Sequence, residues 1–143
     1  MDQEPKDKKK RADGQISGLA GEFFVAAELL KREIQTSITL GNAKSIDLFA
    51  FNESTGRSFN VQVKTLRKVN YFLIDPKRVI TDHVYVFVLL NKPDERVQYF
   101  VVQGKKLLDN IESFGKSFNV EKMPGILPKD LVKYENAWSI FLE

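Results

Sequence analysis

The most informative stretch of this 143-residue sequence is Phe59-Asn60-Val61-Gln62-Val63-Lys64-Thr65. Its β-branched and aromatic residues predict a strand over 58–66. Side chains of a strand alternate between its two faces, so Gln62 and Lys64 share one face while Val61 and Val63 take the other. An amide and an ammonium group on one face of an apolar strand are therefore the first candidates for chemistry.

A second predicted strand, 45–51, precedes this stretch, and Asp47 is its only acid in an otherwise apolar run. The polar segment 52–56 reads as a turn, so the two strands are expected to form a hairpin with Asp47 beside Gln62 and Lys64. With a further strand at 36–40, the three would form an antiparallel meander. A carboxylate buried there without a partner would be costly, which favours a role in binding.

A helix is predicted over 17–33, because apolar residues recur at steps of three and four: Leu19, Phe23, Ala26, Ala27 and Leu30. Gly18 and Gly21 lie in its first turns, although glycine costs roughly 1 kcal/mol against alanine inside a helix. Small residues there suit the close approach of another backbone or a ligand. The same helix can place Glu22 over Asp47.

Downstream patterns predict strands at 71–74, 83–90 and 97–102, a helix at 105–111 and an edge strand at 138–142. The strand 83–90 is apolar on both faces, as the middle of a mixed sheet requires. The expected class is α/β, in which an N-terminal helix and an antiparallel meander lead into a mixed central sheet flanked by helices. Residues 1–14 read as a flexible charged tail, and 15–143 as a single domain.

Composition excludes several kinds of chemistry. There is no cysteine and only one histidine, His83, so a thiol nucleophile, a disulfide, a zinc finger and a multi-histidine metal site are ruled out. Any metal would need oxygen ligands, which suit hard ions such as Mg²⁺. His83 opens an apolar strand, which is typical of a structural histidine rather than a general base. No membrane span or export signal is recognisable, and a cytoplasmic location is expected.

Three short motifs, read together, resemble a known family: Gly18-x-x-Gly21-Glu22, then Ile46-Asp47-Leu48, then Gln62-Val63-Lys64-Thr65. Their order and spacing over residues 17–103 are similar to those of the PD-(D/E)XK nuclease superfamily, the restriction-endonuclease-like fold that includes archaeal Holliday-junction resolvases. The sequence departs from the family pattern at two points. No proline precedes Asp47, and Gln62 stands where an acid is usual, as in the Mrr-like restriction enzymes.

The resemblance implies a metal-dependent DNA endonuclease of resolvase, restriction or repair type, acting as a homodimer and without an organic cofactor. Its catalytic residues would be Glu22, Asp47, Gln62 and Lys64. The metal, Mg²⁺ or in its place Mn²⁺, would be held by Glu22, Asp47, the Gln62 amide oxygen and the Val63 main-chain carbonyl. Lys64 would position the attacking water or stabilise charge in the transition state.

The small net charge, +3, conceals a basic segment at 57–78, which has six basic residues against one acid, Asp75. Apart from Lys64, these cations are the candidates for contacting the DNA backbone: Arg57, Arg67, Lys68, Lys77 and Arg78. One alternative is a catalytically inactive nuclease-fold module that binds DNA or a protein partner. Another is a small-molecule or RNA enzyme on a different α/β scaffold, although no glycine-rich phosphate loop is present. Taken singly, each motif residue also has an ordinary structural explanation. Gln62 and Lys64 could form the solvated face of a strand, Asp47 could pair with a lysine, and Glu22 could be a first-turn helix residue that suits the helix dipole.

Overall fold

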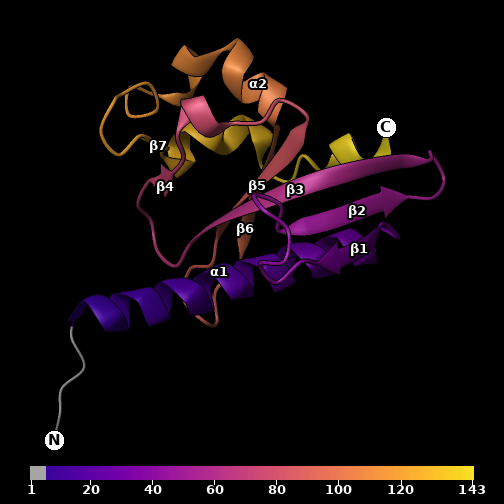
Figure 1. The fold of residues 1–143 in the computed structure, drawn as a ribbon, viewed down its shortest axis with the longest axis horizontal. Coiled ribbons are helices and arrows are strands. Elements are labelled where there is room, and N and C mark those ends of the chain that lie inside the picture. Colours follow the sequence, from indigo (N-terminus) through magenta and orange to yellow (C-terminus); the bar gives the residue numbers. More distant parts are fainter. Residues whose placement is uncertain (1–5) are drawn as a thin grey trace, which may run out of the picture.

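The computed structural model describes residues 6–143, with side chains described from residue 14 onward. Its centre is a five-stranded mixed sheet, in the order β1-β2-β3-β5-β6, and a two-stranded sheet pairs β4 with β7. The strands are β1 (Gln35–Ile38), β2 (Leu48–Asn52), β3 (Arg57–Leu66), β4 (Phe72–Leu73), β5 (His83–Leu89), β6 (Gln98–Gln103) and β7 (Gly125–Ile126). The α/β class with a mixed sheet is confirmed (Figure 1).

Strand pairing follows the predicted meander and then changes direction. β1, β2 and β3 are antiparallel neighbours, β3 and β5 are parallel, and β5 and β6 are antiparallel again. The parallel pair requires a crossover, and the chain between β3 and β5 supplies it through β4 and the short 3-10 helix η1 (Pro76–Arg78). This crossover covers the face of β3 that carries Lys64.

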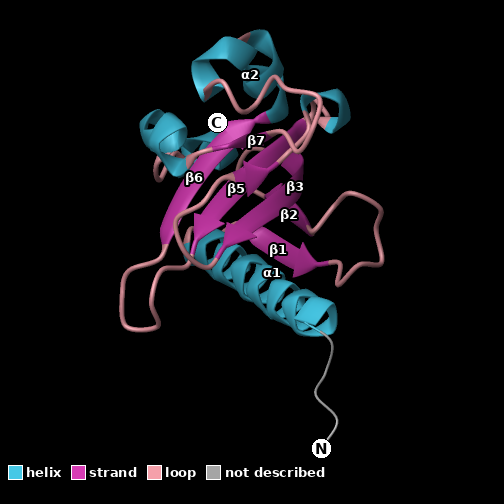
Figure 2. Ribbon diagram, turned by 90° about the vertical axis from the view of Figure 1, so that its left-hand side faces the viewer, coloured by secondary structure: helices cyan, strands magenta, loops and turns pink. Residues whose placement is uncertain are grey.

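Helices cover both faces of the sheet (Figures 1 and 2). The long helix α1 (Lys6–Lys31) lies along one face, and α2 (Gly104–Asp109) lies over the other together with the 3-10 helices η2 (Ile111–Phe114) and η3 (Pro128–Tyr134). The helix was predicted to begin at residue 17, but it begins at Lys6. Residues 6–16 contain no proline and only one glycine, so their composition is compatible with a helix. Residues 1–5 of the predicted tail lie outside the described residues.

Alternating side chains divide the interior into two cores. On the α1 side, Val25 and Leu29 pack with Val61, Val86 and further apolar residues. On the other side, Tyr85 and Phe87 pack under the crossover and the C-terminal helices. Every residue of β5 is buried, as its uniformly apolar pattern predicts. Within residues 6–143, no helix has the length and apolar composition that a bilayer crossing requires.

The C-terminal segment corrects one prediction. Residues 138–142 form the 3-10 helix η4 (Trp138–Leu142) instead of an edge strand. A 3-10 helix has three residues per turn, so Trp138 and Phe141 face the same way. Both are buried, and Phe141 packs edge-on against Phe59 with ring centroids 5.0 Å apart. Burying both aromatic rings against the sheet requires this spacing of three, which a strand with a period of two would not supply.

Candidate functional site

Asp47 lies at the end of the β2–β3 ladder and is fixed there by three hydrogen bonds. Its N–H donates to the Val61 carbonyl at 2.9 Å, and its carbonyl accepts from the Thr39 N–H at 3.0 Å. Its side-chain Oδ2 accepts from the Val63 N–H at 2.8 Å. The N–H and C=O of one strand residue point to the same edge of the strand, so the Val63 carbonyl is also directed toward the Asp47 side.

Glu22 reaches Asp47 because α1 approaches β3 closely at Gly21. A Cβ atom on Gly21 would overlap the Thr65 side chain, so only glycine permits this spacing of helix and strand. The pKa of Glu22 is raised from 4.5 to about 7, first by burial, then by the negative charge of Asp47, and also by a hydrogen bond with Asp47. The two glycines of α1 predicted a close approach of another backbone or a ligand, and Gly21 makes such a contact with β3.

Among residues 14–143, no cationic side chain forms an ion pair with Glu22 or Asp47. Among the side chains that the structure describes, the ion pair within 4 Å is Arg32–Glu28, at 2.7 Å, and it lies elsewhere on α1. Within the same residues, no group of three or more acids or histidines is arranged to hold a metal. A cation at the two carboxylates would therefore take its further oxygen ligands from an amide, the main chain or water.

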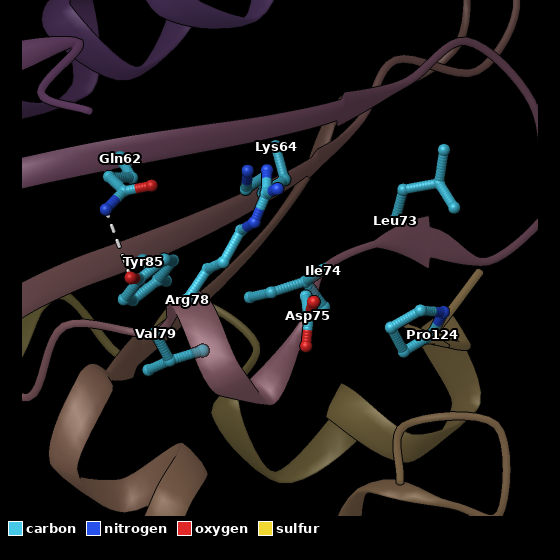
Figure 3. Close-up of a pocket in the computed structure, with 9 residues that line it drawn as sticks. All are labelled: Gln62, Lys64, Leu73, Ile74, Asp75, Arg78, Val79, Tyr85 and Pro124. Carbon is cyan, nitrogen blue, oxygen red and sulfur yellow. Dashed lines mark hydrogen bonds between the residues drawn. The ribbon is translucent and has the colours of Figure 1, made fainter. Parts of the chain in front are cut away.

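Gln62 is buried on the face of β3 that points away from α1, with 8% of its surface exposed. Its Nε2 lies 3.0 Å from His83 Nδ1 and donates to the Tyr85 hydroxyl at 3.0 Å. The Tyr85 hydroxyl also accepts from the Ile80 N–H at 2.9 Å. Figure 3 shows the Gln62 amide oxygen turned away from Tyr85, on the side where Lys64 lies.

A cavity of about 250 Å³ lies beside this amide, and Gln62, Lys64, Tyr85, Asp75 and Arg78 are among the residues that line it. Arg78 extends from η1 toward Lys64 (Figure 3). Asp75 caps η1, because its Oδ1 accepts from the Lys77 N–H at 2.9 Å. The cavity therefore brings two cations together beside the amide oxygen, and the 3-10 helix that carries Arg78 is held by this cap.

The predicted site residues fall into two groups that meet at the end of the ladder. Asp47 contacts the Glu22 side chain, which comes from α1, and the main-chain N–H of Val63. Gln62 and Lys64 share the cavity on the face of β3 that points away from α1. Because Leu48 pairs with Val61, the next antiparallel pair along the ladder is Asp47 with Gln62. Glu22 was expected over the spot where Asp47, Gln62 and Lys64 meet, and α1 brings it to Asp47.

The five cations predicted to bind DNA are not equivalent. Arg78 lines the cavity, while Arg67 donates through Nε to Ser17 Oγ at 3.0 Å and so joins β3 to α1. Arg57 packs over the Phe59 ring and bonds the Glu143 carbonyl. It lies seven residues before Lys64 on the same strand, about 23 Å away. Lys68 and Lys77 are exposed.

Tyr85 was not among the predicted site residues, and His83 was expected to be structural. Both contact Gln62 because β3 and β5 are parallel, with Gln62 opposite Tyr85 and Asn60 opposite His83. Burial lowers the pKa of His83 below 6.5, against the opposing effect of Asp82. A neutral imidazole can accept a hydrogen bond, as the contact with Gln62 Nε2 requires. Nothing in the sequence indicates this strand register.

Comparison with known proteins identifies a structural likeness. No protein-family model matches the sequence, and no curated protein matches it either. Among solved structures, the fold is similar to that of the bacterial homing endonuclease I-Ssp6803I, with a TM-score of 0.53 and 18% identity. The match covers 90% of this chain and 92% of that protein. The two proteins therefore share a fold over nearly their full lengths.

Proposed function

We propose that this protein is a metal-dependent DNA endonuclease that hydrolyses phosphodiester bonds. The proposal rests on the convergence of Glu22, Asp47 and Val63 at the end of the β2–β3 ladder. At the same end of the ladder, Gln62 opens onto a cavity that Lys64 and Arg78 also line. Carboxylates for a divalent cation and adjacent cations for a phosphate are the two requirements of phosphodiester hydrolysis.

The residues fit a hard divalent cation. Two carboxylates lie together, and the raised pKa of Glu22 reflects in part the repulsion from Asp47 that a bound cation would relieve. The Val63 carbonyl and the Gln62 amide oxygen would add neutral oxygen ligands, and water would complete the octahedron that Mg²⁺ prefers. A bound Mg²⁺ or Mn²⁺ would supply Lewis acidity and a water of lowered pKa.

The remaining work belongs to side chains of this protein. Lys64 would hold the attacking water or stabilise negative charge on the phosphate, and Arg78 would contact a non-bridging phosphate oxygen from the opposite wall of the cavity. Exposed Lys68 and Lys77 would extend the positive surface along the DNA backbone. We assign Arg67 chiefly to holding α1 against β3, and Arg57 to a position outside the cleavage site.

The motif resemblance to PD-(D/E)XK nucleases and the fold likeness to a homing endonuclease both support DNA as the substrate. In this proposal the enzyme is of resolvase, restriction or repair type and acts as a homodimer, because cutting two strands requires two active sites.

A cleavage assay tests the proposal. Supercoiled plasmid, single-stranded DNA and a four-way junction are incubated with the protein in Mg²⁺, in Mn²⁺ and in EDTA. Wild-type protein should cut at least one substrate only when a metal is present, and Asp47→Asn and Lys64→Met should each reduce the rate at least a hundredfold. The control is Asp94→Asn, an exposed acid in the β5–β6 loop, which should cleave like wild type. Cleavage that persists in both site variants would mean that the activity comes from a contaminant.

A second candidate function is a nuclease-fold module that binds DNA or a protein partner without cutting. The observation that favours it is Gln62, which replaces a charged ligand and leaves two acids at the site. In that case DNA binding would be retained in EDTA, no metal would give cleavage, and Asp47→Asn would leave binding unchanged.

A further inference from the structure

We propose that Tyr85 and His83 are positioning residues, which hold the Gln62 side chain so that its amide oxygen, and not its nitrogen, faces the cavity and would be available to a metal ion. This inference rests on the proposed function and assigns a role to two residues outside the motifs. The geometry is direct: Gln62 Nε2 lies 3.0 Å from both His83 Nδ1 and the Tyr85 hydroxyl.

A glutamine ligand has a problem that a glutamate does not have. The two ends of its amide are nearly the same size, but only the oxygen can ligate a cation, while the NH₂ group would repel it. A carboxylate presents oxygen in either orientation. A glutamine at this position of β3 therefore functions as a ligand only when its surroundings select one of two orientations.

The surroundings of Gln62 make that selection from both sides. The NH₂ group has two hydrogens, and the two neighbours on β5 provide one acceptor for each. On the cavity side stand Lys64 and Arg78, which carry donors and no acceptors. The cations on the cavity side disfavour an inverted amide, because its NH₂ group would be directed at them, so the oxygen is directed into the cavity (Figure 3). With His83 Nδ1 unprotonated, both hydrogens of the NH₂ group then have an acceptor on β5.

The Tyr85 hydroxyl is itself fixed in place. It accepts from the Ile80 N–H at 2.9 Å, in the segment between η1 and β5. The tyrosine ring is 1% exposed and packs in the core beneath the crossover. Because this acceptor on β5 is rigid, its hydrogen bond fixes the orientation of the Gln62 amide on β3, as a positioning residue must.

A double-mutant cycle on metal affinity separates positioning from mere support of the fold. The dissociation constant for Mn²⁺ is measured by calorimetry in wild type, Tyr85→Phe, Gln62→Glu and the double variant, without DNA. Tyr85→Phe should weaken Mn²⁺ binding about fivefold or more in the Gln62 background and less than twofold in the Gln62→Glu background. The reason is that a carboxylate needs no orientation, whereas loss of the Ile80 hydrogen bond is common to both backgrounds.

Two controls complete the design. Tyr99→Phe removes a buried hydroxyl from β6 on the α1 side of the sheet, and should leave Mn²⁺ affinity unchanged. His83→Leu removes the second acceptor and should repeat the pattern of Tyr85→Phe in both backgrounds, which keeps the test available if one variant folds poorly. Thermal melting establishes that each variant is folded.

The outcomes are distinct. Equal losses of Mn²⁺ affinity in the Gln62 and Gln62→Glu backgrounds, or no loss in either, would overturn the positioning role. The proposed function would still stand if the wild type bound Mn²⁺ in a way that depends on Asp47. Mn²⁺ binding that is absent, or that survives Asp47→Asn unchanged, would overturn both.

Discussion

The carboxylate of Asp47 accepts a hydrogen bond from the main-chain N–H of Val63 at 2.8 Å. Regular pairing of β2 with β3 stops at Leu48–Val61. Beyond that pair, the Asp47 side chain, and not a main-chain carbonyl, accepts the hydrogen bond from the Val63 N–H. The acid is thus held by one oxygen, and its side chain also forms a hydrogen bond with Glu22. One hydrogen bond both terminates the strand pairing and orients a proposed metal ligand.

This relationship separates stability from function at Asp47. Asp47→Asn keeps a side-chain oxygen for the Val63 N–H and should change the unfolding free energy by less than about 1 kcal/mol, while cleavage falls at least a hundredfold. Asp47→Ala leaves that N–H without its partner and should cost about 1–3 kcal/mol. Urea unfolding and single-turnover cleavage measure the two effects, and a severe stability loss in the asparagine variant would contradict this view.

Glu22 should make the metal-free protein sensitive to pH. The folded-state pKa, about 7, lies above the unfolded value of 4.5, so the native state binds more protons between these values. Stability should therefore rise as pH falls from about 7 toward 4.5, and a penalty should remain above pH 7. Glu22→Gln should remove this dependence and stabilise the protein at pH 8 by about 1 kcal/mol, because partial solvation screens the full effect.

The measurement for Glu22 is urea unfolding in EDTA at pH 5 and pH 8. Glu28→Gln is the matched control, since Glu28 lies on the same helix in an ion pair with Arg32. Saturating Mg²⁺ should reduce the difference between wild type and Glu22→Gln at pH 8 if the cation binds the carboxylate pair. An identical pH profile for Glu22→Gln and wild type would refute the assignment.

The two glycines of α1 should respond in opposite directions to alanine. Gly21→Ala places a methyl group on the Thr65 side chain and should destabilise the protein by about 1–3 kcal/mol, with a loss of activity as α1 moves from β3. Gly18 has open space around a new Cβ, so Gly18→Ala should stabilise by about 0.5–1 kcal/mol. Denaturant unfolding compares them, and Gly21→Ala combined with Thr65→Ala should recover part of the loss.

Arg78 should contribute to DNA binding in a salt-dependent way. Arg78→Met should weaken the binding of duplex DNA about three- to tenfold in EDTA and lower the slope of log K against log salt by about one. Lys129→Met, an exposed cation on η3, is the control and should change neither quantity. Fluorescence anisotropy over a salt series makes the comparison. Equal effects of the two substitutions would show that Arg78 contributes only general charge.

The local elements could be predicted because their patterns are strong. The antiparallel meander and the opposite facing of Gln62 and Val63 follow from the alternation of apolar residues, and the doubly buried β5 follows from its uniform apolar run. The helix start at Lys6 and the 3-10 helix at the C-terminus were not predicted, because propensity alone does not mark where packing ends a helix or selects its period.

The sequence by itself determined which residues are the candidates for the proposed chemistry: two acids, an amide and a lysine at fixed positions along a helix and two strands. Only the tertiary structure decided how they meet. The close approach of α1 at Gly21 brings Glu22 to Asp47, and the parallel register of β3 with β5 places Tyr85 and His83 against Gln62. The physical reason is that periodicity specifies the face on which a side chain lies, whereas register and interlayer distance depend on contacts between residues far apart in the chain.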